Sequence, residues 1–319
     1  MKIALITPAA ATSRYGNRNT AVRWAELLRE LGHQVSVQER WNGRSTDLML
    51  ALHARRSHDS IIRYAERNPD RPLILALTGT DLYRDIRDNA NAQESLELAT
   101  RIIVLQDMGL RVLAPRLRRK TRVIYQSCEP IAKQPPIGSC FEIIVSGHLR
   151  EEKDPFCGAA ALAHLPAASR IRITHIGGAR EPAMAVEARR WMKLESRYHW
   201  LGELKRPHAL ATLARGQVML ISSRMEGGAN VVSEALTARV PVVASRIPGN
   251  IGMLGSDYRG YYPLGNARAL ARLLRRIETD AELLDTLRRQ CAERRKLISR
   301  SRERLSLRKL LAELRQKLS

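Results

Sequence analysis

The stretch SSRMEGGANVVSEAL at residues 222–236 follows the apolar run QVMLIS and places two glutamates, eight positions apart, around a Gly-Gly pair. A helix capped by Ser223, with Glu226 as its third residue, would be a capping box. That arrangement puts both glycines in the first helical turns, where each costs about 1 kcal/mol relative to alanine. We therefore expect a buried strand that ends near Ser222, a glycine loop, and a helix that starts near Ala229.

The glycine loop predicts the kind of ligand. Glycines let a ligand approach the backbone N–H groups at a helix N-terminus, and that position favours a phosphate. Glu226 in the loop and Glu234 in the helix would then accept hydrogen bonds from hydroxyls on either side of the phosphate. A nucleotide sugar presents a sugar on one side of its diphosphate and a ribose on the other, so this stretch predicts a nucleotide-sugar site. Its other expected contacts are Gly227, Gly228, Ala229, Asn230 and Val231.

Around this stretch the chain alternates short apolar runs with segments of helical periodicity. The alternation predicts an α/β protein with doubly wound parallel sheets. A length of 319 residues fits two domains of about 150 residues each. The best linker candidate is CEPIAKQPPIGSC at residues 128–140, which holds three prolines and a glycine. We expect Rossmann-like domains at residues 1–137 and 138–299, with the ligand at the carboxyl ends of the strands, in the cleft between the domains.

Residues 300–319 form a separate C-terminal element. Its leucines repeat at helical spacing, so the sequence predicts a helix with one apolar face that needs a surface to lie against. The leucines of this face are Leu307, Leu310, Leu311, Leu314 and Leu318.

The net charge of +22 is compatible with nucleic acid, a membrane surface or an anionic substrate as partner. We do not expect nucleic acid, because aromatic residues make up only 4% of the chain and paired glutamates repel a phosphate backbone. The longest apolar runs are far shorter than the roughly 20 residues of a membrane span. The start MKIALITP enters a strand without signal-peptide features, so we expect a cytoplasmic protein without stable membrane insertion. Four cysteines lack any C-x-x-C pair, and we expect no metal and no cofactor. The oligomeric state stays open.

Four motifs of the second domain occur in order along the chain. They are VSGHLREEKDP, THIGGA, YHWLGEL and SRMEGGANVVSEALTARVPVVAS. Together they resemble the phosphate-binding loop, the glycine-marked strands and the E-x7-E segment of family-4 glycosyltransferases, which have the GT-B fold. The resemblance implies that Glu226 contacts the donor sugar, Glu234 the ribose and Lys153 the diphosphate, and that the last helix returns to the first domain. It also implies donor contacts at Gly147, His148, Arg150, Gly202 and Leu204.

One residue departs from this family pattern. His148 stands where the family usually has an arginine. Either Arg150 supplies that charge, or His148 is neutral and faces another group.

Three stretches of the first domain carry a second resemblance. They are RYGNRNTAVRWAELLRELGH, LMLALHARRSHDSI and LALTGTDLYRDI, and together they resemble the selenosugar synthases of selenoneine biosynthesis. The resemblance extends over nearly the full length of the chain and implies a UDP-N-acetylglucosamine donor and a selenophosphate acceptor. The implied reaction releases UDP and, after loss of phosphate, gives a selenosugar.

The residues of these three stretches suit an anionic acceptor, whose pocket needs cations and fixed hydrogen-bond donors at strand ends. The expected acceptor contacts are Gly16, Asn17, Arg18, Thr20, Arg55, Arg56, Thr78, Gly79 and Thr80. His53 and Asp81 lie beside them in sequence as catalytic candidates. A selenium nucleophile is already anionic at neutral pH, so we expect His53 and Asp81 to orient the reactants rather than to remove a proton.

Each stretch also has a purely structural interpretation. Asn17 or Asn19 could cap a helix, Asp81 could cap the helix through LYRDI, and one of the two arginines Arg55 and Arg56 is expected on the surface. Two other functional classes stay open for the whole protein. One is an ordinary glycosyltransferase that acts on a lipid, a glycan or a small-molecule hydroxyl, and the other is a nucleotide-binding protein without chemistry.

Overall fold

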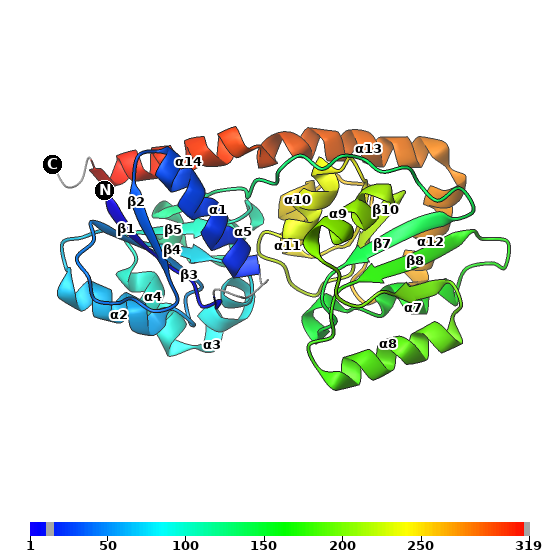
Figure 1. Cartoon of the computed structure of the whole chain (residues 1–319), viewed down its shortest axis with the longest axis horizontal. Helices are drawn as coiled ribbons and strands as arrows, with labels where there is room; N and C mark the ends of the chain where they lie inside the picture. The colour runs from blue at the N-terminus through cyan, green and yellow to red at the C-terminus, as the bar shows by residue number, and fades with distance from the viewer. Residues whose placement is uncertain (11–15, 316–319) are drawn as a thin grey trace. The chain divides into compact units, whose positions relative to one another are not determined.

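The computed structural model describes residues 1–10 and 16–315 and divides into two compact units. The first unit comprises Met1–Ser127 and Ser299–Ser319, and the second comprises Cys128–Ile298. Within the described residues, each unit is built on a six-stranded sheet whose neighbouring strands are parallel (Figure 1). The predicted α/β fold with two doubly wound parallel sheets is confirmed.

The strands of the first unit lie in the order β2-β1-β3-β4-β5-β6. They are β1 (Lys2–Ile6), β2 (Gln34–Gln38), β3 (Leu48–Leu52), β4 (Leu73–Leu77), β5 (Arg101–Val104) and β6 (Thr121–Val123). The helices are α1 (Gly16–Glu30), α2 (His58–Arg67), α3 (Ile86–Asp88), α4 (Ala90–Leu98), α5 (Met108–Val112), α6 (Pro115–Arg119) and α14 (Arg300–Arg315), with a π-helical turn over Asp81–Asp85. The inner strands β3, LMLAL, and β4, LILAL, are apolar throughout because helices cover both faces of the sheet, whereas the edge strand β2, QVSVQ, is partly exposed.

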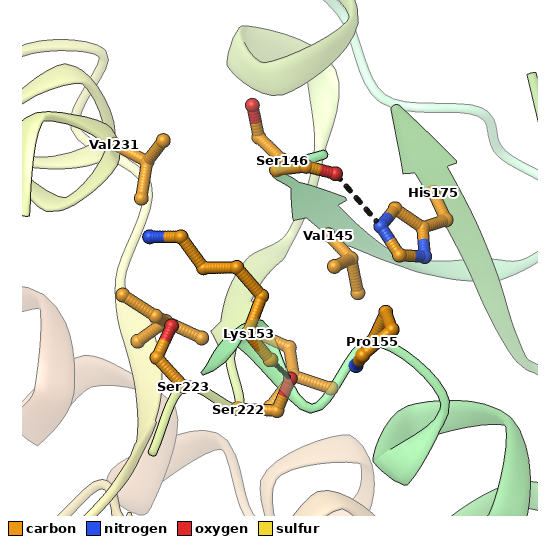
Figure 2. A pocket seen from close by; sticks show the side chains of 11 residues that line it. Val145, Ser146, Lys153, Pro155, His175, Ser222, Ser223 and Val231 are labelled. Carbon is orange, nitrogen blue, oxygen red and sulfur yellow. Dashed lines mark hydrogen bonds between the residues drawn. The ribbon is translucent and has the colours of Figure 1, made fainter. Parts of the chain in front are cut away.

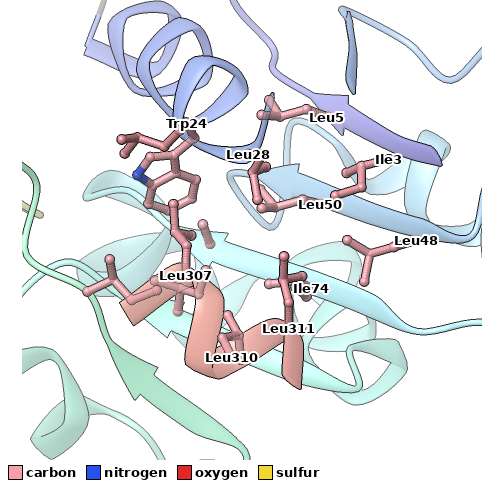
Figure 3. Packing of buried hydrophobic residues seen from close by; sticks show 14 of the residues in the cluster. Ile3, Leu5, Trp24, Leu28, Leu48, Leu50, Ile74, Leu307, Leu310 and Leu311 are labelled. Carbon is pink, nitrogen blue, oxygen red and sulfur yellow. The ribbon is translucent and has the colours of Figure 1, made fainter. Parts of the chain in front are cut away.

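Helices cover both faces of the first sheet. On one face, α1 and α14 pack against β1 and β3 in a cluster that includes Leu5, Leu50, Trp24, Leu28, Leu307, Leu310, Leu311 and Leu314 (Figure 3). On the other face, α2 and α4 contribute Ile61, Tyr64 and Leu96 to a second cluster. The apolar face of α14 is therefore buried within the first unit. Leu318, which we expected on the same face, lies outside the described residues.

A buried carboxylate fixes α14 in place. Glu303 is only 1% exposed, and it accepts hydrogen bonds from Trp24 Nε1 of α1 at 2.6 Å and from the amide of Ser127 at 2.9 Å. Arg23 Nε lies 3.2 Å from the same carboxylate and neutralises its charge. Glu303 thus ties the C-terminal helix both to α1 and to the last residue of the first chain segment.

The strands of the second unit lie in the order β12-β11-β10-β7-β8-β9. They are β7 (Phe141–Ser146), β8 (Ile171–Ile176), β9 (Tyr198–Trp200), β10 (Val218–Ile221), β11 (Val242–Ser245) and β12 (Tyr261–Tyr262). The helices are α7 (Cys157–Leu162), α8 (Pro182–Leu194), α9 (Arg206–Arg215), α10 (Asn230–Thr237), α11 (Pro248–Leu254), α12 (Ala267–Thr279) and α13 (Ala281–Arg295), with short 3₁₀ turns over Glu151–Lys153 and Lys296–Ile298. The strand order reverses between β7 and β10, and ligands of open α/β sheets bind at the carboxyl ends of strands where such a reversal occurs.

The segment between the two sheets belongs to the second unit. We expected residues 128–137 in the first domain, but the amide of Gln134 donates to the carbonyl of Ala214, at 3.3 Å, in the second unit. The amide of Cys128 likewise donates to the carbonyl of Ile298 at 3.4 Å, so the two ends of this unit are hydrogen-bonded to each other. No helix among the described residues is long and apolar enough to cross a membrane.

Shortening the buried leucines of α14 should destabilise the first unit. Leu307 is 1% exposed, and Leu307→Ala should lower the free energy of unfolding by about 2–5 kcal/mol because it leaves a cavity beside Trp24. Leu305, on the same helix, is 38% exposed, and Leu305→Ala should cost less than about 1 kcal/mol. Urea unfolding followed by tryptophan fluorescence measures both changes. Equal losses in the two variants would contradict the burial of this face.

Candidate functional site

A small pocket opens in the second unit at the carboxyl ends of β7, β8 and β10 (Figure 2). Its lining includes Gly147 and Lys153 from the loop after β7, His175 at the end of β8, Ser223 after β10 and Val231 in the first turn of α10. These strands flank the point at which the strand order reverses. The pocket therefore lies where the doubly wound fold places a ligand.

The carboxylate of Glu226 is held at the edge of this pocket. It is 7% exposed, and its Oε1 accepts a hydrogen bond from Ser223 Oγ at 2.6 Å and another from Lys153 Nζ. The ion pair with Lys153 offsets the cost of burying the charge. In the part of the chain that the structure describes, Oε2 of Glu226 has no hydrogen-bond partner. Two residues that we predicted for the donor site are thus in direct contact, and one carboxylate oxygen can still accept a hydrogen bond.

The glycine loop after Glu226 leads into α10 as the sequence predicted. β10 ends at Ile221 and α10 starts at Asn230. Ala229 precedes the helix in the left-handed conformation, with φ of 33° and ψ of 66°. Among the described residues, the backbone amides of residues 227–231 have no hydrogen-bond acceptor, although Gly227, Gly228 and Ala229 are buried. A run of unpaired amides at a helix N-terminus is suited to an anionic ligand, because buried N–H groups need acceptors.

Glu234 lies in the second turn of α10 and does not line the pocket. Its side chain is 13% exposed, and Oε1 accepts a hydrogen bond at 3.1 Å from Arg206, which is 61% exposed at the start of α9. A ribose that binds Glu234 has to share or replace this arginine. The predicted donor contacts Gly202 and Leu204 lie in the loop between β9 and α9, and neither lines the pocket.

His175 is a residue of the pocket that the sequence analysis missed. It is 1% exposed, and burial lowers its pKa from 6.5 to about 4. Nε2 lies 3.1 Å from the carbonyl oxygen of Gly147 (Figure 2). Nδ1 lies 2.9 Å from the hydroxyl of Tyr198. A neutral ring that donates from Nε2 and accepts at Nδ1 satisfies both contacts. His175 therefore fixes the carbonyl of Gly147 at the pocket wall, and its only sequence signal was its position two residues before the glycines of THIGGA.

Of the two alternatives for His148, the structure favours the neutral one. Its Nδ1 accepts a hydrogen bond from the amide of Gly178 at 3.2 Å, so this nitrogen carries no proton. Burial lowers the pKa of His148, and the charge of Arg180 lowers it further. His148 thus does not replace the family's arginine as a cation, whereas Arg150 is exposed in the same loop.

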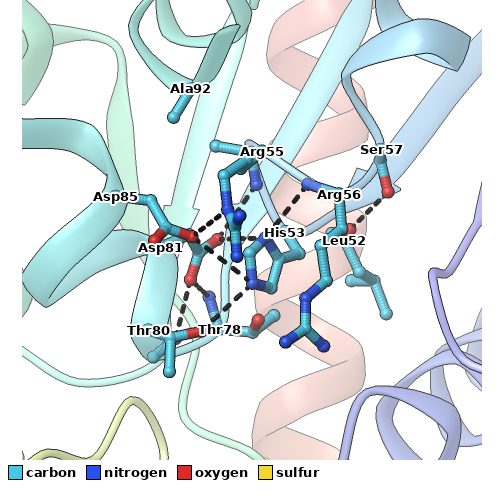
Figure 4. A network of polar contacts seen from close by, with 12 residues as sticks. Leu52, His53, Arg55, Arg56, Ser57, Thr78, Thr80, Asp81, Asp85 and Ala92 are labelled. Atoms are coloured by element: carbon cyan, nitrogen blue, oxygen red, sulfur yellow. Dashed lines mark hydrogen bonds and ion pairs between the residues drawn. The ribbon is translucent and has the colours of Figure 1, made fainter. Parts of the chain in front are cut away.

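In the first unit, His53 is the residue around which the predicted acceptor residues gather, at the ends of β3 and β4 (Figure 4). It is 2% exposed and has a left-handed backbone with φ of 75°. Nδ1 accepts from the amide of Arg56 at 3.3 Å, and Nε2 lies 3.1 Å from Thr80 Oγ1. Burial lowers the pKa of His53 and outweighs the opposing effect of Asp81, so the ring is neutral at neutral pH. His53 can orient a ligand through Thr80, but both of its nitrogens are already in use.

Asp81 holds the backbone of the same loops. The carboxylate is fully buried and accepts hydrogen bonds from the amides of Thr78 and Gly79, both at 2.9 Å, and from the amide of Ala54 at 3.0 Å. These bonds tie the loop after β3 to the loop after β4. We listed Asp81 as a catalytic candidate and as a possible helix cap, and the structure places its carboxylate away from solvent, on three amides of these two loops.

Asp85 is the second residue that the sequence analysis missed. It is 6% exposed, its Oδ2 accepts from Arg55 Nε at 2.9 Å, and it lies 3.9 Å from His53 Nε2. Arg55 is therefore paired. The side chain of Arg56 is exposed, and in the described residues it has no ion-pair partner, which leaves its guanidinium available to an anion (Figure 4).

The first turn of α1 holds the remaining predicted residues. The helix begins at Gly16, so Asn17 and Asn19 lie inside it and neither is its cap. Asn17 and Arg18 are half-buried. Thr20 is buried, donates to the carbonyl of Gly16 at 2.9 Å and accepts from Gln126 Nε2 at 2.6 Å. We expected Thr20 to contact the acceptor, but its hydroxyl is satisfied within the protein.

Comparisons with known proteins support the fold and identify a family. Residues 130–297, more than half of the chain, match the family model described as glycosyl transferases group 1. HepE from Anabaena in complex with UDP and glucose is 17% identical, with a TM-score of 0.78 over 98% of this chain and 100% of that chain. Sucrose-phosphate synthase from Thermosynechococcus elongatus is 17% identical, with a TM-score of 0.76 over 99% of each chain. No curated protein matches the sequence.

The buried His175 should make stability depend on pH. The unfolded chain takes up a proton near pH 6.5, whereas the folded protein does so near pH 4, so acid favours the unfolded state between these values. Relative to His175→Gln, the wild type should lose roughly 3 kcal/mol of stability as pH falls from 6.5 to 4. Urea unfolding of both proteins at several pH values measures the difference. His208→Gln, an exposed histidine on α9, is the control, and identical pH slopes in all three proteins would contradict the burial of His175 as a neutral ring.

Proposed function

Because the chain belongs to the group 1 glycosyl transferase family, we propose that it transfers the sugar of a UDP-sugar to selenophosphate. The proposed donor is UDP-N-acetylglucosamine. A carbon–selenium bond forms at the anomeric carbon while the bond from that carbon to the diphosphate breaks, and UDP leaves with the bonding electron pair. Water then cleaves the selenium–phosphorus bond, which releases inorganic phosphate and leaves the selenol of the selenosugar.

The observation that carries the donor half of this proposal is the row of amides at residues 227–231 that find no acceptor within the described part of the chain. These amides stand beside Lys153, whose ammonium has two further N–H donors besides the one given to Glu226. A diphosphate supplies the acceptors and the negative charge that both features lack. HepE has been solved with UDP and with UDP-glucose on the same fold, which supports UDP as the leaving group.

We assign different roles to the two glutamates. Oε2 of Glu226 would accept a hydrogen bond from the donor sugar while Lys153 and Ser223 hold Oε1. Glu234 would bind the ribose after its hydrogen bond with Arg206 breaks. Arg206 is exposed, so water can then solvate its guanidinium. The pair thus brackets the diphosphate as the spacing of the motif suggests.

The acceptor half rests on the polar groups around His53. Arg56 presents an exposed cation in the loop after β3. Both candidate bases are in use, since three amides occupy Asp81 and both ring nitrogens of His53 are bonded. A nucleophile that is already anionic needs orientation and charge neutralisation rather than a base. Selenophosphate is such a nucleophile, whereas a neutral hydroxyl is not.

The two glutamate roles predict a split between binding and turnover. Glu234→Ala should weaken UDP binding by about tenfold or more, since it removes a charge-assisted hydrogen bond. Glu226→Ala should lower kcat and leave the affinity for UDP within about threefold, because UDP lacks the sugar. Calorimetric titration with UDP and steady-state kinetics separate these effects. Arg206→Ala is the control, because it removes the hydrogen bond from Arg206 to Glu234 and should not weaken UDP binding. Equal UDP affinity in wild type and both glutamate variants would refute the assignment.

The acceptor assignment is tested by UDP release from UDP-N-acetylglucosamine with selenophosphate, with a neutral alcohol, or with buffer alone. Selenophosphate should stimulate release, and Arg56→Ala should lower kcat/KM for selenophosphate by roughly tenfold to a hundredfold while the KM for the donor changes little. Arg63→Ala removes an exposed charge from the neighbouring helix α2 and should behave like wild type. Transfer to the alcohol without a response to selenophosphate would instead identify an ordinary glycosyltransferase.

A further inference from the structure

We infer that Ser245 and Asn250 are positioning residues. They hold the loop after β10, which carries Glu226, through contacts from β11 and α11. Neither belongs to the predicted site, and neither lines the pocket. They lie at the end of β11 and in the first turn of α11, next to β10 in the sheet. The inference rests on the proposed role of Glu226 in binding the donor sugar.

A directional chain of hydrogen bonds leads from α11 to the carboxylate. Asn250 Nδ2 donates to Ser245 Oγ at 3.1 Å and to the carbonyl of Ser245 at 2.9 Å. Ser245 Oγ donates to the carbonyl of Ser223 at 2.6 Å. Ser223 Oγ donates in turn to Glu226 Oε1 at 2.6 Å. Ser223 is thus held at its carbonyl by Ser245, and its hydroxyl holds Glu226.

All members of this chain are shielded from water. Ser245 and Asn250 are fully buried, and Ser223 is 1% exposed. Water cannot take over a hydrogen bond that is lost here. Removing Ser245 Oγ leaves the carbonyl of Ser223 without this donor. Removing Asn250 Nδ2 takes a donor from Ser245 Oγ, although the carbonyl of Ser245 still accepts from the amide of Ile247 at 2.9 Å. A change at Asn250 or Ser245 should therefore be relieved by movement of the Ser223–Glu226 segment.

A close backbone contact couples the same two elements independently of these bonds. A β-carbon on Gly249 would lie 2.0 Å from the carbonyl oxygen of Glu226 and 2.9 Å from its β-carbon. The start of α11 therefore lies directly against the peptide of Glu226, and glycine is required there to permit the approach. The loop that carries the carboxylate rests on α11 at Gly249 and on Ser245 through Ser223.

The contacts of Asn250 indicate that its side-chain amide is needed for the N–H donors on Nδ2. Its Oδ1 is buried and has no partner among the described residues. An unpaired buried acceptor is unfavourable, and an apolar side chain would avoid it. The two hydrogen bonds from Nδ2 to Ser245 are the compensation that the structure shows.

The experiment compares Ser245→Ala and Asn250→Ala with wild type by UDP release and by calorimetric UDP affinity. Both variants should lower kcat by about tenfold or more and leave UDP affinity within about threefold, because they displace Glu226 and not the amides that bind the diphosphate. Ser245→Thr keeps the hydroxyl and should retain kcat within about threefold. Leu254→Ala removes a buried side chain at the other end of α11, so it reports the effect of destabilising the helix alone.

A coupled variant separates positioning from a general structural role. In a Glu226→Gln background, Ser245→Ala should lower kcat much less than it does in wild type, because both changes act through the same carboxylate. An undiminished effect of Ser245→Ala in that background would overturn the inference. So would an unchanged kcat in Ser245→Ala, or a parallel loss of kcat and UDP affinity that Leu254→Ala reproduces. If Asn250→Ala does not fold, the comparison of Ser245→Ala with Ser245→Thr tests the inference. Absence of any UDP-sugar turnover in wild type would refute the proposed function, and with it the role of Glu226.

Discussion

The proposed donor site depends on one constraint, which is that a buried carboxylate must be neutralised and hydrogen-bonded. Glu226 meets this condition through Lys153 from the loop after β7 and Ser223 from the loop after β10. These loops converge because β7 and β10 are parallel neighbours at the reversal of strand order, where the connecting helices diverge. Any shift of strand register would separate the lysine from the carboxylate. The register of the sheet, set by apolar strands buried on both faces, thus determines where the charge pair can form.

The first unit also buries a carboxylate, but different groups stabilise it. Asp81 is also a buried carboxylate beside the ends of parallel strands, but its donors are three neutral amides, so it is saturated and rigid. Glu226 is neutralised by the Lys153 side chain, and among the described residues its Oε2 has no hydrogen-bond partner. The first arrangement suits a group that shapes a pocket, and the second suits a group that exchanges partners when a ligand enters.

Local pattern predicted the strands, the two-sheet class and the start of α10 near Ala229, because apolar runs and glycine placement act over a few residues. Side-chain partners from distant segments could not be predicted in this way. The sequence analysis did not single out Asp85, which lies in the π-helical turn over Asp81–Asp85 and is buried against Arg55, a residue 30 positions earlier in the chain. The sequence predicted that Thr20 contacts a ligand, but its hydroxyl accepts a hydrogen bond from Gln126, a residue far along the chain. The proline-rich segment at residues 128–140 indicated a boundary, but hydrogen bonds to distant residues determine on which side of it the segment lies.

Backbone strain marks the same loops independently of side-chain chemistry. Among the described non-glycine residues, His53, Asp154 and Ala229 have left-handed φ angles at candidate sites, and Arg239 has one at the C-terminal end of α10. At His53 the side chain offsets the strain, because replacing His53 by glycine would remove both hydrogen bonds of the imidazole ring. Ala229 makes no such contact. A glycine there would relieve the strain but would place three glycines in a row, and the added freedom would raise the entropic cost of ordering the loop. The methyl group of Ala229 therefore lowers the entropic cost of ordering the loop that carries the amides of residues 227–231.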